Sequence, residues 1–184
     1  GSIGEERSQG KGPPVRHNGY MNEATSSTTG GRWFEQLPVG LVIKHDLLRT
    51  ITEADNEDFC AMTHNPQPLH LDAEFAATTV FGQRLVNSLL TLGLAVGVSV
   101  ADTTLGTTVA NLGFEETDFP APVFLNDTLS FETEVAAARL SASKPATGIV
   151  TFEHRVHNQD GVLVCRCRRN ALMHRDPNLL TDSQ

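Results

Sequence analysis

The sequence predicts an α+β fold in which a curved antiparallel sheet wraps around one long buried helix. The run VNSLLTLGLAVGVSV at 86–100 is apolar on nearly every side and carries two glycines, which is typical of a helix packed closely against a sheet. Strand-like segments follow it, and two of them flank Gln159-Asp160-Gly161, a strong hairpin signal. The order of strand, helices and then several strands favours separate helix and sheet layers.

The 184 residues are enough for one domain. Residues 1–31 are rich in Gly, Ser, Thr, Pro and charge and have almost no apolar side chains, so we expect a flexible N-terminal tail. Gly1-Ser2 is typical of a tag remnant, and Met21 is a candidate native start, so part of this tail is a tag or an extension. We expect the folded domain at 32–175 and a C-terminal tail at 176–184.

Charge and cysteine content exclude several classes of protein. The net charge of −8 argues against nucleic-acid binding, which needs a basic surface. Cys60, Cys165 and Cys167 are an odd number of cysteines, so we expect a reducing compartment without disulfides. We find no apolar run long enough to cross a bilayer and no signal peptide, and therefore expect a cytoplasmic protein that does not bind membranes.

The first half of the folded part is expected to be mainly helical. Residues 41–51 have the alternation of a strand, and Thr52 with Asp55 forms a weak capping box for a helix that turns Phe59 and Met62 inward. The segment NPQPLHLD at 65–72 contains two prolines and is expected to be a rigid, irregular connector. Asp72 can cap a short helix, and residues 81–83 separate that helix from the long one.

The second half is expected to form the sheet. Strands are predicted at 107–114, 116–119, 128–139, 148–158 and 162–173, with a turn at Asn126-Asp127. In the last strand Cys165 and Cys167 share one face, where we expect core cysteines, and Arg166 and Arg168 share the other. A C-x-C pair without further ligands is a poor zinc site, so no metal is expected.

The run from Ile51 to Leu94, with PLHLD followed by FG and a buried helix, resembles the MaoC-like dehydratase family of (R)-specific enoyl-CoA hydratases. The later FPAPVFLNDTL and FEHRVHNQDGVLVCR support the resemblance, which covers about 32–175. It implies the hot-dog fold, an acyl-CoA substrate held between two subunits or halves, and hence a homodimer or higher homo-oligomer for a single copy. No cofactor is implied, because hydration needs only proton transfers.

The resemblance also implies site residues. The family's loop carries an aspartate five residues before a histidine, and the matching positions here are Asn65 and His70. Asn65 departs from the family pattern, and Gln67 stands where the family often has asparagine. Backbone N–H groups near the start of the central helix hold the thioester oxyanion in the family. They map to the Asn87-Ser88 region, where the family usually has His-Gly, and we count the preceding Val86 as a substrate-binding position as well.

The chemistry of hydration agrees with this assignment. Addition of water to an enoyl thioester needs a base near neutral pKa, a proton donor for the α-carbon, and donors aimed at the enolate oxygen. His70 suits the first or second role. Asn65 is no base but can orient water, and the missing charge would make room for an anionic acyl group, such as a C5 itaconyl- or mesaconyl-type thioester.

Other interpretations of these residues remain open. An acyl-CoA thioesterase or a non-catalytic acyl-CoA-binding protein would have the same fold, and the missing aspartate favours the second. His70 would then be a structural histidine, Asn65 a turn cap, and Asn87 and Ser88 helix-capping residues. Four arginines are candidates to contact CoA phosphates, or else form a solvated charged row: Arg84, Arg166, Arg168 and Arg169.

Overall fold

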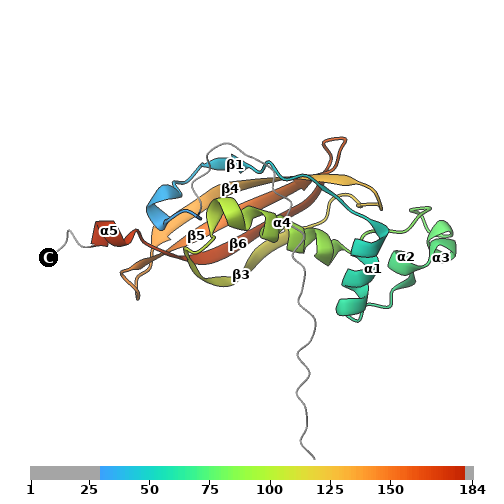
Figure 1. Ribbon diagram of the computed structural model, residues 1–184, viewed down its shortest axis with the longest axis horizontal. Helices are drawn as coiled ribbons and strands as arrows, with labels where there is room; N and C mark the ends of the chain where they lie inside the picture. Colours follow the sequence, from blue (N-terminus) through green and yellow to red (C-terminus); the bar gives the residue numbers. More distant parts are fainter. Residues whose placement is uncertain (1–29, 181–184) are drawn as a thin grey trace, which may run out of the picture.

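The computed structural model describes residues 30–180, which form an antiparallel sheet with one long helix lying across it (Figure 1). The helices are η1 (Phe34–Gln36), α1 (Glu53–Met62), α2 (Pro68–Leu71), α3 (Ala73–Ala77), α4 (Ser88–Thr103) and α5 (Pro177–Leu180). The strands are β1 (Val42–Lys44), β2 (Arg49–Thr50), β3 (Thr108–Asp118), β4 (Thr128–Leu140), β5 (Thr147–His157) and β6 (Leu163–His174). The predicted α+β architecture is confirmed. Most of the expected N-terminal tail and the end of the C-terminal tail lie outside the described residues.

The sheet has the order β1-β4-β5-β6-β3, and the short β2 also pairs with β4. All pairings are antiparallel. The hairpin predicted at Gln159-Asp160-Gly161 joins β5 to β6, with Gly161 at φ +74°, a conformation that glycine adopts without strain. Two strands predicted at 107–119 are a single strand, β3, which lies at the edge of the sheet.

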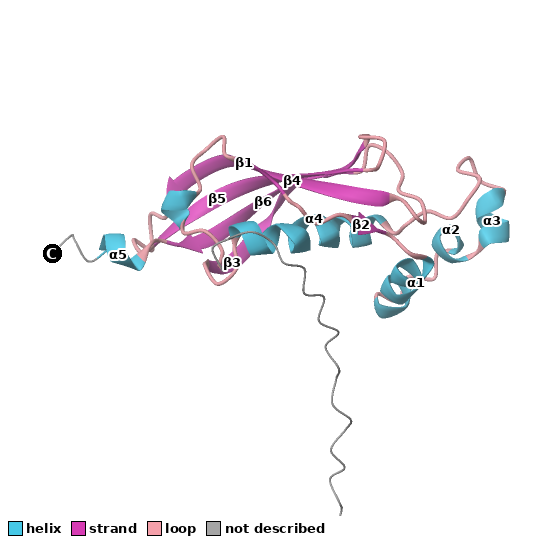
Figure 2. Ribbon diagram, turned by 45° about the horizontal axis from the view of Figure 1, so that its top comes forward, coloured by secondary structure: helices cyan, strands magenta, loops and turns pink. Residues whose placement is uncertain are grey.

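Helix α4 lies along one face of the sheet (Figure 2), and its buried side chains form a stripe of small residues. Its buried residues are Thr91, Ala95, Ser99 and Thr103, one per helical turn. The two glycines do not mediate the close approach to the sheet, because a Cβ added at Gly93 or Gly97 would meet no atom within 4 Å. The expectation that these glycines let the helix pack closely against the sheet was wrong. No helix among residues 30–180 is long and apolar enough to cross a membrane.

The segments before α4 differ from the sequence prediction in three places. The strand expected at 41–51 is interrupted between β1 and β2, where His45 turns into the interior. The capping box of Thr52 and Asp55 is confirmed, but Met62 is 72% exposed and α1 buries Asn56 and Cys60 instead. The expected irregular connector contains one helical turn, α2, because Pro68 occupies its first position, where proline fits a helix.

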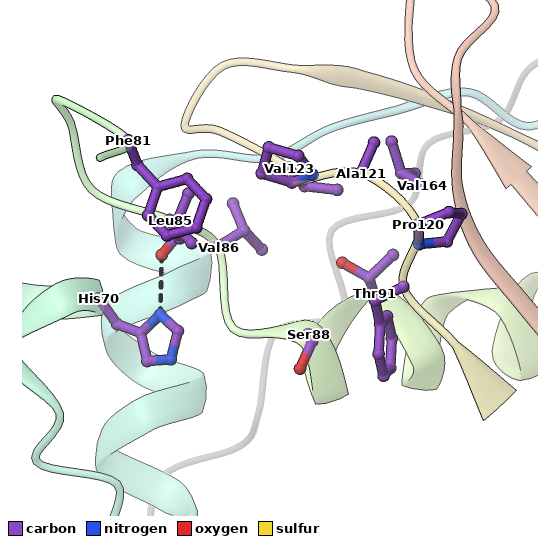
Figure 3. Close-up of a pocket in the computed structure, with 12 residues that line it drawn as sticks. His70, Phe81, Leu85, Val86, Ser88, Thr91, Pro120, Ala121, Val123 and Val164 are labelled. Carbon is purple, nitrogen blue, oxygen red and sulfur yellow. Dashed lines mark hydrogen bonds between the residues drawn. The ribbon is translucent and has the colours of Figure 1, made fainter. Parts of the chain in front are cut away.

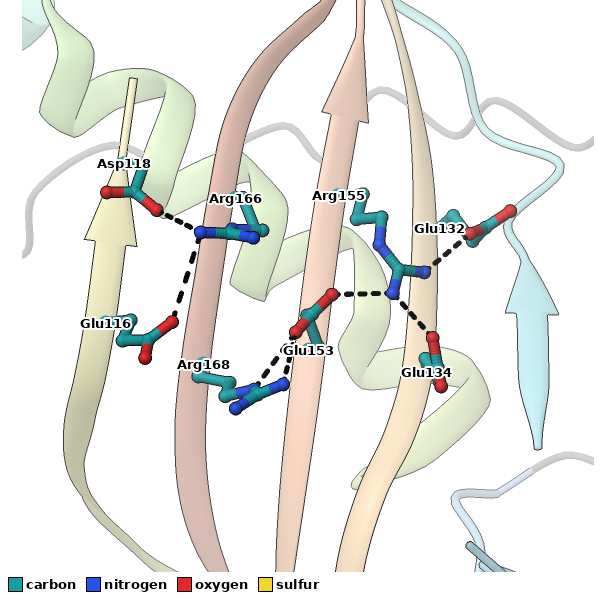
Figure 4. A network of polar contacts seen from close by, with 8 residues as sticks. All are labelled: Glu116, Asp118, Glu132, Glu134, Glu153, Arg155, Arg166 and Arg168. Atoms are coloured by element: carbon teal, nitrogen blue, oxygen red, sulfur yellow. Dashed lines mark hydrogen bonds and ion pairs between the residues drawn. The ribbon is translucent and has the colours of Figure 1, made fainter. Parts of the chain in front are cut away.

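The alternation predicted for β6 is confirmed. Cys165 and Cys167 are fully buried, and burial raises the pKa of Cys165 to about 12 and of Cys167 to about 11, so both thiols stay neutral. Arg166 and Arg168 project from the opposite face into ion pairs with Asp118 and Glu153 (Figure 4). The same network contains Glu116, Glu132, Glu134 and Arg155.

A chain of hydrogen bonds, buried except at Asp102, runs from the C-terminal end of α4 into the sheet. Arg169 Nε donates to His154 Nε2 (2.9 Å), so the His154 proton is on Nδ1, which bonds Thr133 Oγ1 at 2.8 Å. Thr133 then donates to His45 Nε2 (2.8 Å), and His45 Nδ1 donates to Asp102 at 2.6 Å. Burial first, and then the charge of Arg169, lower the pKa of His154 to about 3. The chain therefore requires neutral His154.

This depressed pKa predicts that acid destabilises the fold. An unfolded histidine titrates near 6.5, so between about pH 6.5 and 3 the unfolded state binds a proton that folded His154 excludes. This contribution to stability is complete above pH 6.5, and each unit below it removes up to about 1.4 kcal/mol. Urea unfolding from pH 7 to 5 should show a smaller loss of stability for His154→Gln than for wild type. His174→Gln, at an exposed position, is the control. Equal pH slopes for wild type and His154→Gln would contradict the assignment.

Candidate active site

One pocket of about 340 Å³ lies between the N-terminal end of α4 and the segment that follows β3 (Figure 3). Its polar side chains are those of His70, Ser88 and Thr91. The other lining residues are apolar: Phe81, Leu85, Val86, Phe119, Pro120, Ala121, Pro122, Val123 and Val164. Three polar groups in an apolar pocket are typical of a site that binds a small organic group and orients it.

His70 reaches this pocket from the one-turn helix α2. Its Nδ1 lies 3.0 Å from the carbonyl oxygen of Leu85. A carbonyl only accepts hydrogen bonds, so Nδ1 carries the proton and Nε2 of the neutral ring keeps its lone pair. Figure 3 shows that second nitrogen turned away from Leu85, where no residue of the described chain bonds to it. His70 is thus oriented to accept a proton through Nε2.

The side chain of Asn56, on α1, holds the backbone at His70 and Leu85 in place. Asn56 is 1% exposed, and its Nδ2 donates to the carbonyl oxygens of His70 (3.0 Å) and Leu85 (3.4 Å). Its Oδ1 accepts from the backbone N–H of Asn87 at 2.8 Å. One amide therefore links α1, α2, the segment before α4 and the start of α4.

The start of α4 leaves one backbone donor free. Asn87 is the N-cap, and its side-chain oxygen accepts from Leu89 N–H at 3.0 Å, while its own N–H bonds Asn56. The carbonyl of Asn87 accepts from Leu90 and Thr91 N–H groups. The N–H of Ser88 has no acceptor among residues 30–180, and the helix dipole favours negative charge at this end. The geometry favours Ser88 as an oxyanion donor and a capping role for Asn87.

The structure does not bring Asn65 into the pocket of His70. Asn65 lines a separate hollow with His64, Pro66 and Leu71. Its Oδ1 accepts from Gln67 N–H at 3.0 Å, which is a turn-capping bond, and Gln67 is the exposed N-cap of α2. Contacts of Asn65 and Gln67 with a substrate therefore stay predictions.

The guanidinium of Arg84 already forms ion pairs within the protein. Its guanidinium contacts the carboxylates of Glu53 and, at 3.1 Å, Glu57 on α1, and it also donates to the carbonyl of Leu71. The hydrogen bonds that Arg84 donates to these carboxylates, first of all to Glu53, raise its pKa above the usual value of an arginine. The two negative charges offset the charge of Arg84, so its geometry favours a structural role, joining α1 to the loop before α4. Val86, by contrast, lies in the lining of the pocket.

Two residues of this site were not singled out from the sequence. Asn56 looks like an ordinary surface residue of an acidic helix, and only its four-residue spacing from the buried Cys60 indicates an inward side chain. Thr91 is a polar residue within an apolar run, one helical turn after Ser88. For Thr91, the available signal was a polar residue within a helix that the sequence predicts to be buried. For Asn56, the only signal was its spacing from Cys60.

Comparison with known proteins assigns the fold and the family. A family model described as a MaoC like domain matches residues 34–158. A Mycobacterium tuberculosis protein with a double hot-dog fold superposes with a TM-score of 0.74 at 25% identity, over 81% of this chain and 46% of that chain. This chain has the hot-dog fold and belongs to the MaoC-like domain family.

Curated relatives are named as hydratases. The mesaconyl-CoA hydratase of Cereibacter sphaeroides is 33% identical over 137 residues, which is 74% of this chain but 39% of that protein. The (R)-specific enoyl-CoA hydratase of Aeromonas caviae is 34% identical over 120 residues, 65% of this chain and 84% of that protein. The match thus spans well under half of the first relative and most of the second.

Proposed function

We propose that this protein is a lyase that adds water to a small enoyl-CoA thioester, or removes it from the hydroxyacyl-CoA. The observation that carries the proposal is that His70 and Ser88 line one pocket, while His70 Nε2 and the Ser88 N–H at the N-terminus of α4 have no partner among residues 30–180. The first is a base and the second an oxyanion donor, the two parts that hydration requires. The named activities of the relatives support the same class of reaction.

One histidine can perform both proton transfers. His70 Nε2 removes a proton from water as the water oxygen bonds to the β-carbon, and electrons shift from the carbon–carbon double bond to the thioester oxygen. Ser88 N–H donates to that oxygen and stabilises the enolate. The imidazolium then returns the proton to the α-carbon as the carbonyl re-forms. No proton or electron is left over, so the proposed reaction needs neither a metal nor a redox cofactor.

For the substrate we propose a C5 dicarboxylic acyl group of the itaconyl or mesaconyl type. The residues that line the His70 pocket include no carboxylate, and position 65, outside this lining, carries an uncharged amide. A carboxylate on the acyl group therefore meets no like charge in the lining, where two carboxylates at low dielectric constant would repel each other. The name of the Cereibacter sphaeroides relative supports this choice. Among the residues that line the His70 pocket there is no Asp or Glu, which disfavours a thioesterase that activates water with a carboxylate.

Turnover by His70 variants tests the reaction. Wild type should consume the conjugated enoyl-thioester absorbance of mesaconyl-type CoA more efficiently than that of crotonyl-CoA, and His70→Ala should lower kcat by about 10²–10⁴-fold. His174→Ala, an exposed histidine at the end of β6, should retain full activity. Equal activity of His70→Ala and wild type would reject the assigned base. Free thiol release would instead indicate a thioesterase, and a preference for crotonyl-CoA would reject the dicarboxylic substrate.

We further propose that two copies of this chain form the functional unit. The edge strand β3 has one unpaired side, and Val109, Leu112 and Phe114 on it are exposed apolar residues. An exposed apolar edge strand is unfavourable unless another chain covers it. The double hot-dog protein of Mycobacterium tuberculosis supports this assembly, since the present chain covers about half of it.

Sedimentation measures this association directly. Wild type should sediment as a species of twice the 19.9 kDa chain mass or a larger multiple, and Leu112→Lys should shift it toward the monomer because a charge on the edge opposes pairing. Leu140→Lys, an equally exposed leucine at the end of β4, is the matched control. A monomeric wild type at micromolar concentration would contradict the proposal.

A further inference from the structure

The hydroxyl of Thr91 is buried in the wall of the His70 pocket without a hydrogen-bond partner. Thr91 is 1% exposed, and its Oγ1 has no partner among the described residues. Figure 3 shows this oxygen on the pocket side of α4. A buried hydroxyl without a partner is unfavourable, so its presence at a pocket indicates a ligand that supplies the partner.

Other hydroxyls of the same helix behave differently. Ser99 Oγ donates to the carbonyl of Val96 at 2.7 Å, and Thr103 Oγ1 donates to the carbonyl of Ser99 at 2.5 Å. These bonds to a carbonyl three or four residues earlier are the usual ones for a helical hydroxyl. The equivalent carbonyls for Thr91 belong to Ser88 and Asn87, and Thr91 Oγ1 bonds neither of them.

The position of Thr91 along α4 corresponds to the far end of a short acyl chain. Ser88 and Thr91 are three residues apart, about 4.5 Å along the helix axis, and both line the pocket. If Ser88 N–H holds the thioester oxygen, Thr91 lies deeper, near the position of the fourth carbon. The lining also includes the apolar side chains of Val123 and Val164, and its other polar side chains are those of Ser88 and His70.

We propose that Thr91 is a specificity-determining residue whose hydroxyl, assisted by the N-terminal dipole of α4, binds a carboxylate on the acyl group. The inference rests on the proposed function and deepens it. A carboxylate accepts the O–H bond that Thr91 cannot make within the protein. A terminal methyl group would bury the same hydroxyl unpaired, so the pocket discriminates against purely alkyl acyl groups.

The test uses Thr91→Val, which removes the hydroxyl and keeps the shape, and Thr91→Ser, which keeps the hydroxyl. Relative to wild type, Thr91→Val should lower kcat/KM for mesaconyl-type CoA at least about tenfold and leave kcat/KM for crotonyl-CoA unchanged or higher. Thr91→Ser should retain the wild-type preference. Thr103→Val is the control, since that buried hydroxyl bonds Ser99 and lies outside the pocket lining. An equal loss on both substrates, or no loss, would overturn the proposal.

A binding measurement separates this inference from the proposed reaction. Succinyl-CoA and butyryl-CoA differ by a carboxylate in place of the terminal methyl, and neither can be hydrated. By calorimetry, wild type should bind succinyl-CoA more tightly, and Thr91→Val should erase that difference without lowering Tm, because it removes an unpaired buried hydroxyl. This result with no turnover would overturn only the hydratase function. Equal affinities of wild type for both thioesters would overturn the role of Thr91.

Discussion

The hydrogen bonds of the Asn56 side chain are the interaction on which the site depends. A primary amide offers two donors and an acceptor in one plane, and Asn56 uses both kinds of group to hold carbonyls of α2 and the pre-α4 segment and an N–H at the start of α4. Without Asn56, the carbonyl of His70 and the N–H of Asn87 would each lose the hydrogen-bond partner that the structure gives them. Because Leu85 also receives His70 Nδ1–H, the same segment that Asn56 fixes determines the tautomer of the histidine.

The polar groups at the two ends of α4 differ in whether they form hydrogen bonds within the protein. At its N-terminal end the polar groups are left free at a pocket, whereas at its C-terminal end His45, Thr133 and His154 form a continuous series of hydrogen bonds from Asp102 to Arg169 Nε. Arg169 Nη2 has no partner among the described residues. Hydrogen bonds between buried side chains rigidify a fold, whereas free donors at a pocket are available to a ligand. The helix thus joins a rigid interior to a reactive surface. The free N–H and hydroxyl groups at the first end account for both the chemistry and the choice of acyl group that we propose.

Periodicity and turn residues were sufficient to predict the sheet, the long helix and the Gly161 hairpin, because these elements depend on local pattern. These local patterns failed where tertiary contacts decide which side chains are buried. Met62 is exposed because α1 turns Asn56 and Cys60 inward, and the glycines of α4 face away from the sheet. At the site, the position of His70 followed from its proline-rich segment and family resemblance. Asn65 caps a turn instead of lining the same pocket, and the role of Asn56 requires contacts across 31 residues, which no local pattern contains.

The proposed reaction depends on a neutral His70 that presents an unprotonated Nε2 to the pocket. Nitrogen-15 chemical shifts of the imidazole, measured above the histidine titration and assigned by comparison with His70→Ala, test it directly. We expect a protonated Nδ1 and an unprotonated Nε2 for His70, since the carbonyl of Leu85 can only accept a hydrogen bond. The opposite tautomer, with the proton on Nε2, would contradict the account, because the pocket would then face a donor and the proposed base would have no lone pair to offer.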